Sequence, residues 1–171
     1  VEKSNAMGCQ SSTQSNTTTT AGARYAKSPP QATTQQSSIS TGAIHSENVF
    51  CYARHTPHPS QVLSGSEDRT CALFDLQTPQ VVQRYGQAAH ERHTGDVTCV
   101  ASARHAGLVV SGSRDATIKL WHADTGALRH TFQKAHQFSV TCVATTSGTE
   151  DMPEQGVTHI VSGSRDCTLK L

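Results

Sequence analysis

The sequence predicts an all-β fold, built from a repeated unit of short antiparallel strands and preceded by a disordered tail. Three observations support this prediction. One polar segment recurs three times in the second part of the 171-residue chain, the apolar residues around it alternate or run for only a few positions, and residues 1–43 have a different, strongly polar composition.

The N-terminal region, residues 1–43, is rich in small polar side chains. Between Gln10 and Thr41, 21 of 32 residues are Ser, Thr, Gln or Asn, and the only large apolar side chains are Tyr25 and Ile39. Such a segment cannot bury enough apolar surface to offset the entropy that ordering costs. We therefore expect a disordered tail over 1–43 and a folded part over 44–171.

The folded part contains an internal repeat. Its first element is an aliphatic residue followed by Ser-Gly-Ser-x-Asp-x-Thr, at residues 63–70, 110–117 and 161–168. A second element begins with His and continues to a Cys and an Ala, and it precedes each copy at residues 45–53, 93–101 and 136–144. Because the two elements keep their order, this is a true repeat, with units at about 45–91, 92–134 and 135–171.

Each unit is predicted to hold four short antiparallel strands. In the middle unit we expect them at about 95–102, 108–113, 117–121 and 127–133, separated by turn-forming residues. Four such strands make one blade of a β-propeller, and propellers generally need about four to eight blades. The third unit stops before its outer strand, so we expect a partial propeller from a longer protein.

The repeat resembles the WD-repeat (beta-transducin-like) family. Residues 108–121, which read Leu-Val-Val-Ser-Gly-Ser-Arg-Asp-Ala-Thr-Ile-Lys-Leu-Trp, match the family pattern closely. The chain departs from the pattern where His122 replaces the Asp after Trp121 and where Phe74 replaces a Trp. In addition, the family usually has Gly before the repeat's His, and here the three residues are Ile44, Arg92 and Ala135. These departures affect local hydrogen bonds and entry turns rather than the fold.

The resemblance implies that the recurring polar residues form a buried hydrogen-bond chain. A Ser, a His and an Asp also suggest a nucleophilic triad, but an active site would not need three copies. A carboxylate accepts N–H bonds, a hydroxyl donates and accepts, and an indole only donates, which suits a structural network. We therefore predict no enzymatic activity and three networks: His93, Ser111, Asp115 and Trp121 in the middle unit, His45, Ser64 and Asp68 in the first, and His136, Ser162 and Asp166 in the third.

The cysteines are interpreted as packing residues. Cys51, Cys99 and Cys142 occupy the same strand position in the three units and are expected to be small buried hydrophobes. No Cys-x-x-Cys motif occurs and no His stands at ligand spacing from a Cys, so we expect no metal site and no cofactor. His55 and His58 are expected in a solvated loop.

Composition excludes two classes of partner. With 14 Lys and Arg against 13 Asp and Glu, the net charge is +1 and no basic stripe is visible, so nucleic-acid binding is not expected. The sequence has no apolar run of about 18 residues and no signal-peptide core, so no membrane-spanning helix is expected. Reduced thiols spread through the repeats are typical of a cytoplasmic protein.

The residue before each turn Asp is a candidate for partner binding. The resemblance places this position at the rim of the propeller's top face, where partners commonly dock, and here it is Glu67, Arg114 and Arg165. One carboxylate and two guanidinium groups are able to clamp a carboxylate or a phosphorylated peptide, the alternative being ordinary surface solvation. Residues 147–156 are expected to form an acidic surface insertion.

The N-terminus carries a lipidation pattern. Met7-Gly-Cys-Gln-Ser-Ser12 fits N-myristoylation of Gly8, with Cys9 as a palmitoylation site, provided that translation starts at Met7. Two acyl chains would hold the protein stably on a membrane. Membrane association is expected only if Gly8 and Cys9 are acylated.

These observations predict a non-catalytic scaffold whose partners are other proteins. Two alternatives stay open at this point. One is an acylated membrane adaptor that uses Gly8 and Cys9. The other is the targeting part of a larger ubiquitin-ligase or BEACH-type trafficking protein, because residues 93–101 and 110–115 look like blades of the latter family.

Overall fold

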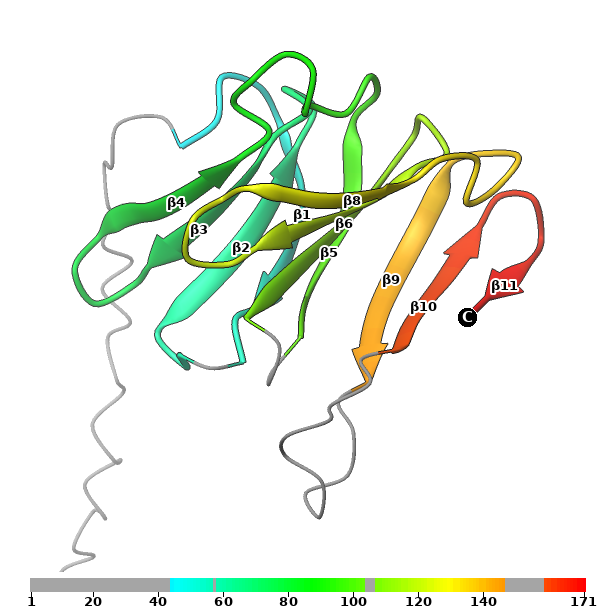
Figure 1. The fold of residues 1–171 in the computed structure, drawn as a ribbon. Helices are drawn as coiled ribbons and strands as arrows, with labels where there is room; N and C mark the ends of the chain where they lie inside the picture. Colours follow the sequence, from blue (N-terminus) through cyan, green and yellow to red (C-terminus); the bar gives the residue numbers. More distant parts are fainter. Residues whose placement is uncertain (1–43, 57, 104–106, 147–158) are drawn as a thin grey trace, which may run out of the picture. The chain divides into compact units, whose positions relative to one another are not determined.

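The computed structural model describes residues 44–56, 58–103, 107–146 and 159–171, which form three antiparallel sheets (Figure 1). The first sheet comprises β1 (Val49–Arg54), β2 (Gln61–Ser66), β3 (Cys71–Asp75) and β4 (Gln80–Tyr85). The second comprises β5 (Val97–Ala103), β6 (Leu108–Ser113), β7 (Ile118–His122) and β8 (Leu128–Phe132). The third comprises β9 (Val140–Thr146), β10 (His159–Ser164) and β11 (Leu169–Lys170).

The predicted all-β fold is confirmed, and consecutive strands pair as neighbours in every sheet. The strands of the second sheet begin and end within two residues of the bounds that the sequence predicts. Over the described ranges the chain forms no helix that is long and apolar enough to cross a membrane. The expected tail over 1–43 and the expected insertion over 147–156 lie outside the described residues.

The same turn joins the second and third strands of each sheet. In the second sheet the Ser113 N–H donates to the Thr117 carbonyl at 3.2 Å, and the Ala116 N–H donates to the Ser113 carbonyl at 3.2 Å. Ala116 has a φ of 67°, and its counterparts Arg69 and Cys167 have φ values of 69° and 63°. The repeated Ser-x-Asp-x-Thr segment therefore imposes one backbone conformation three times, left-handed residue included.

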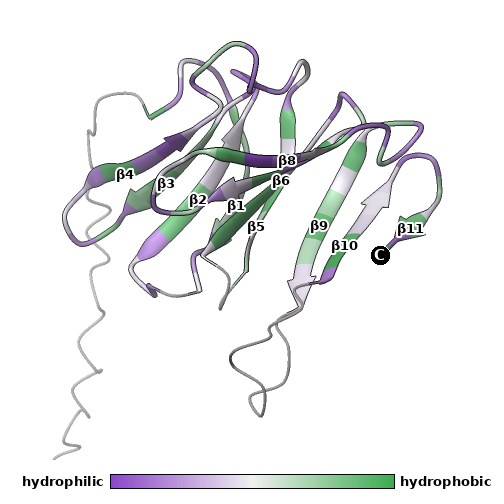
Figure 2. Ribbon diagram, viewed as in Figure 1, coloured by the Kyte–Doolittle hydropathy of each residue, from purple (hydrophilic) through white to green (hydrophobic). Residues whose placement is uncertain are grey.

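The inner strand β5 packs against both β1 and β9, and this packing holds the three sheets together. Leu63, Tyr85, Val97 and Trp121 belong to the core between the first and second sheets. A second core contains Cys99, Val110, Ile118 and Val140. Figure 2 shows hydrophobic residues along β3, β5 and β9 and hydrophilic ones along the outer strand β4. Because both faces of β6 are covered, all six of its residues are buried.

The glycines of the first two Ser-Gly-Ser segments allow the next sheet to approach closely. A Cβ atom built on Gly112 would lie 2.7 Å from both the Cys99 Sγ and a methyl carbon of Val140. At Gly65 the nearest atom, a methyl carbon of Val97, would be 2.6 Å away. A larger residue would push the sheets apart, so the repeat keeps glycine here for packing rather than for a turn.

The burial predicted for the cysteines is correct for only one of the three repeat positions. Cys99 is buried, but Cys51 is half-buried and Cys142 is exposed. Cys99 lies between the second and third sheets, whereas no sheet of the described chain covers Cys142 from the other side. Burial raises the pKa of the Cys99 thiol to about 12 and that of Cys51 to about 11, so neither forms a thiolate near neutral pH.

The expectation of a solvated loop at His55 was wrong. Its side chain is buried, with 3% of the residue exposed, and the ring Nδ1 lies 2.8 Å from the Ser102 Oγ of the second sheet. The cause is the neighbouring inner strand β5, which packs over the end of β1. Burial and the nearby His58 lower the pKa of His55, so the neutral ring is favoured.

Candidate functional site

The polar residues of the middle repeat meet in one hydrogen-bonded network. His93 bridges the sheet through its two ring nitrogens: Nδ1 lies 3.0 Å from the Asp115 Oδ2 and Nε2 lies 2.9 Å from the Ser111 Oγ. The Trp121 Nε1–H donates to the same Ser111 Oγ at 2.9 Å. The network therefore ties the segment before β5 to β6 and β7.

Thr117 is a member of the network that the sequence analysis left out. Its backbone N–H and its hydroxyl donate to the Asp115 Oδ1 at 2.9 Å and 2.6 Å, and its Oγ1 lies 3.1 Å from the His93 Nδ1. Thr70 and Thr168 make the same contacts with Asp68 and Asp166. The signal was available, since Thr closes every copy of the Ser-Gly-Ser-x-Asp-x-Thr segment.

The first and third repeats rebuild the His, Ser and Asp part of the network. His45 lies 2.9 Å from the Asp68 Oδ2 and 2.9 Å from the Ser64 Oγ. His136 lies 2.9 Å from Asp166 and 2.8 Å from Ser162. In the first repeat no indole reaches the Ser hydroxyl, because Phe74 stands at the Trp position, and the Ser64 Oγ instead donates to the Ala72 carbonyl at 3.4 Å.

The electrostatics of the network suit a structural role. Burial alone would raise the pKa of Asp115, but hydrogen bonds and charge interaction with His93, together with hydrogen bonds from Thr117, outweigh it and hold the pKa well below its ordinary value. Asp115, His93 and Ser111 stand in the order of a nucleophilic triad. However, Ser111 is fully buried and its oxygen accepts the indole N–H, so no substrate can approach it.

The three predicted rim residues occupy one equivalent backbone position. The N–H groups of Glu67, Arg114 and Arg165 donate to the carbonyls of Asn48, Asp96 and Ser139, at 2.9, 2.9 and 3.0 Å respectively. All three therefore lie where the segment before an inner strand meets the Asp-x-Thr turn. We call this side of the sheets the turn edge, defined by residues 67–69, 114–116 and 165–167.

The side chains of the rim residues differ in what they contact. The Arg114 guanidinium forms an ion pair with Asp96 at 2.6 Å and lies 5.3 Å from the centre of the Phe50 ring. The Glu67 carboxylate accepts a hydrogen bond from the Asn48 Nδ2 at 2.9 Å. Within the described part of the chain Arg165 is exposed and has no ion-pair partner. A clamp by Glu67, Arg114 and Arg165 together would have to compete with these internal contacts.

Two exposed aromatic side chains at the turn edge were missed by the sequence analysis. Phe50 is 45% exposed beside Arg114, and Phe138 is 62% exposed next to Ser139, the residue whose carbonyl binds the Arg165 N–H. A signal existed in the repeat itself: Phe50 aligns with Thr98, and Phe138 aligns with Gly95. We call Phe50, Arg114, Phe138 and Arg165 the turn-edge patch.

Two other sequence expectations concern metals and lipids. Among the residues that the structure describes, no group of three or more His, Cys, Asp or Glu side chains is placed to hold a metal ion. Gly8 and Cys9, the predicted acylation sites, lie outside the described residues, so lipidation stays a sequence prediction.

The repeated four-stranded sheets and the repeated His, Ser and Asp network define a repeat protein of the propeller class. Comparison with known families gives the particular group: the family described as "WD domain, G-beta repeat" matches residues 36–75, 86–122 and 126–171. These ranges make up most of the sequence, and the chain belongs to this family. The last range starts before β8, so the family's repeat is offset from the structural sheet.

Curated relatives are similar over short stretches. A guanine nucleotide-binding protein subunit beta of Oryza sativa subsp. japonica is 35% identical over 63 residues, which are 36% of this chain and 17% of the relative. The human Proteasomal ATPase-associated factor 1 is 42% identical over 50 residues, 29% of this chain and 12% of the relative. Protein Notchless of Drosophila melanogaster is 30% identical over 92 residues, 52% of this chain and 18% of the relative. The chain thus spans less than a fifth of these relatives.

Solved structures show the same fold. The WD40 repeats of RRP9 superpose with a TM-score of 0.62 at 23% identity, covering 74% of this chain and 35% of that one. The computationally designed Ika8 protein superposes with a TM-score of 0.55 at 28% identity, covering 74% of this chain and 33% of that one.

Proposed function

We propose that the chain is a non-catalytic scaffold that binds other proteins through the turn-edge patch. The proposal rests on the contrast between the polar side chains of the networks, which bind one another, and the turn-edge patch, which is exposed. The buried His, Ser, Asp and Thr side chains are saturated by one another, whereas Phe50, Phe138, Arg114 and Arg165 present exposed surface along one edge.

The composition of the patch supports a protein partner. Aromatic residues and Arg are the residue types enriched at the energetic centres of protein interfaces. Phe50 and Arg114 come from different sheets and stack on each other, so part of the surface is ordered before any partner arrives. Order of this kind lowers the entropic cost of binding.

The names of two relatives point in the same direction. One is a subunit of a guanine nucleotide-binding protein, and another is a factor associated with a proteasomal ATPase, so each is named for a protein assembly. WD-repeat membership therefore supports a role in protein interaction, and the rim location is our own addition to it.

Substitution within the patch tests the proposal. A tagged chain is used to isolate bound proteins from its own cells, alongside Phe138→Ala, Arg165→Glu and the matched control Arg129→Glu, whose residue is exposed on β8 away from the turn edge. We expect the first two variants to reduce capture about tenfold and the control to leave it unchanged. Because these side chains are exposed, the melting temperature should stay constant in all of them. Equal capture by all four chains would contradict the proposal.

A further inference from the structure

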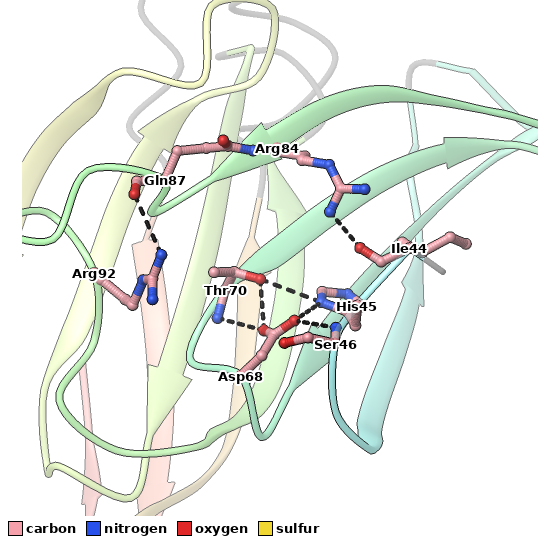
Figure 3. A pocket seen from close by; sticks show the side chains of 8 residues that line it. All are labelled: Ile44, His45, Ser46, Asp68, Thr70, Arg84, Gln87 and Arg92. Atoms are coloured by element: carbon pink, nitrogen blue, oxygen red, sulfur yellow. Dashed lines mark hydrogen bonds and ion pairs between the residues drawn. The ribbon is translucent and has the colours of Figure 1, made fainter. Parts of the chain in front are cut away.

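A polar hollow beside the first repeat's turn has features that the repeat does not require. It has a volume of about 370 Å³ and is lined by residues that include Arg84, Arg92, Gln87, His45 and Asp68 (Figure 3). Arg84 lies on the outer strand β4 of the first sheet, and Arg92 stands just before the His of the second repeat. In Figure 3 the two arginines flank the cluster of Asp68, Thr70 and His45 from opposite sides.

The carboxylate in the hollow is already saturated. The Asp68 Oδ2 accepts from the Ser46 N–H at 3.1 Å and lies 2.9 Å from the His45 Nδ1. Its Oδ1 accepts the backbone and hydroxyl donors of Thr70 at 2.9 Å and 2.6 Å. These bonds account for its acceptor capacity, so the carboxylate belongs to the structural network.

The two guanidinium groups are held in place but not neutralised. Arg84 Nη1 donates to the Ile44 carbonyl, while Arg92 donates through Nε to the Gly86 carbonyl at 3.1 Å and through Nη2 to the Gln87 carbonyl at 3.3 Å. In the described part of the chain neither forms an ion pair, unlike Arg114 with Asp96. Main-chain carbonyls thus orient both side chains and leave most of their N–H donors unused.

The pair of arginines stands beside the first sheet and has no counterpart beside the second. Arg84 pairs with Ala72 across the sheet, and the equivalent partner of Lys119 in the second sheet is Thr131. Arg92 aligns with Ala135, which precedes the His of the third repeat. Since the second sheet forms with Thr131 and Ala135 at these places, the arginines are not needed to build a sheet.

From these observations we propose that the hollow binds the phosphoryl group of a phosphorylated Ser or Thr in a partner protein. Two half-buried guanidinium groups that approach from opposite sides fit a tetrahedral dianion, whose charge offsets both and whose oxygens point in several directions. A planar carboxylate carries one charge and is met best by a single bidentate arginine.

The position of the hollow argues for a protein as the source of the phosphoryl group. Asp68 and Thr70 belong to the same turn as Glu67, at the edge that also carries the turn-edge patch. A peptide segment that crosses this edge can place a phosphorylated side chain in the hollow and neighbouring residues against Phe50 and Arg114. This inference rests on the proposed scaffold function and names the class of partner.

Titration of the full 171-residue chain with a minimal ligand tests the inference. The ligand is O-phosphoserine blocked as its N-acetyl methylamide, and binding is followed by amide chemical shifts. Blocked serine and blocked aspartate serve as ligand controls. We expect phosphoserine to bind, serine not to bind, and aspartate to bind at least about tenfold more weakly. Arg84→Gln and Arg92→Gln should each lower phosphoserine affinity about tenfold, whereas Arg129→Gln should leave it unchanged.

Three results would overturn the inference. One is the absence of phosphoserine binding by the folded chain, and another is undiminished binding by both Arg84→Gln and Arg92→Gln. The third is binding of the chain to vesicles of phosphatidylcholine with phosphoinositide, if this binding needs both arginines and phosphoserine does not bind. Arg92→Gln keeps the Ile44 contact of Arg84, so it remains informative if Arg84→Gln fails to fold. The double variant Arg84→Gln/Arg92→Gln separates the two proposals. If it still captures partners, and this capture is lost on Phe138→Ala, the scaffold function stands and only the phosphoryl site is refuted.

Discussion

The first and second sheets contain the same His, Ser, Asp and Thr contacts but differ in the aromatic residue that stands beside them. Trp121 donates to Ser111 and packs 6.1 Å from the Tyr85 ring, between two sheets. Phe74 offers no donor, and the Ser64 hydroxyl turns to a backbone carbonyl. The His and Asp contacts therefore form without the indole, which contributes packing between sheets and one further hydrogen bond.

The largest expected effect comes from removing the network's acceptor. Asp115→Ala leaves the His93 ring and the N–H groups of Thr94 and Thr117 without their acceptor, and should lower the free energy of unfolding by about 3 kcal/mol or more. Asp68→Ala removes the corresponding contacts in the first sheet and should cost nearly as much. Urea denaturation of both variants measures the two losses.

The decreases in the free energy of unfolding for Asp115→Ala and Asp68→Ala test whether the two networks are alike. If the indole merely adds to a network that is otherwise the same, the losses should agree within about 1 kcal/mol. A much smaller loss for Asp68→Ala would show that Trp121 strengthens the middle network as a whole. Asp115→Asn, which keeps an acceptor oxygen, controls for failure of Asp115→Ala to fold.

Exchanging the aromatic residues tests the indole directly. Trp121→Phe makes the second sheet resemble the first; it removes the bond to Ser111 and part of a fully buried ring, and should cost about 2 kcal/mol. The reverse change, Phe74→Trp, supplies a donor for Ser64 and should stabilise by up to about 1 kcal/mol. Thermal unfolding measures both, and a stabilising Trp121→Phe would refute the role assigned to the indole.

Acid titration separates the contact of His55 with the second sheet from the networks of Asp68 and Asp115. Because burial lowers the pKa of His55, the unfolded chain binds a proton at higher pH than the folded chain does, so stability falls as the pH drops below the ordinary His value of 6.5. Hydrogen bonds lower the pKa of Asp68 and Asp115, so their contribution is present above the ordinary Asp value of 3.8 and is lost below it.

Two variants assign these phases. In urea denaturation across pH, His55→Gln should flatten the loss of stability just below pH 6.5, the ordinary pKa of His. It should leave the loss below pH 3.8, the ordinary pKa of Asp, in place. Asp115→Asn should reduce the second phase and spare the first. A His55→Gln profile that matches the parent's between pH 7.5 and about 5 would contradict the assignment.

The sequence could predict the features that the repeat carries and little of what lies between repeats. Constant spacing of His, Ser and Asp identifies the networks, and short apolar runs locate the strands. Contacts between sheets leave no periodic signal, so the burial of His55 against Ser102 and the stacking of Phe50 on Arg114 appear only in three dimensions. The two arginines of the hollow belong to no common motif, because one lies on a strand and the other in a connection between sheets.

The smallest expected effect concerns the turn, where the two sheets do not differ. Ala116 and Arg69 both adopt a left-handed conformation that L-residues enter at a cost of about 1 kcal/mol. Glycine removes this cost but gains freedom in the unfolded chain. Ala116→Gly and Arg69→Gly should therefore each stabilise the protein by about 0.5 kcal/mol, measured by urea denaturation.

Because the backbone is the same in both turns, the two gains in stability should be equal, whatever aromatic residue follows. Unequal gains would mean that the difference between Trp121 and Phe74 extends into the turn, and the two networks could then no longer be treated as one structure with an indole added.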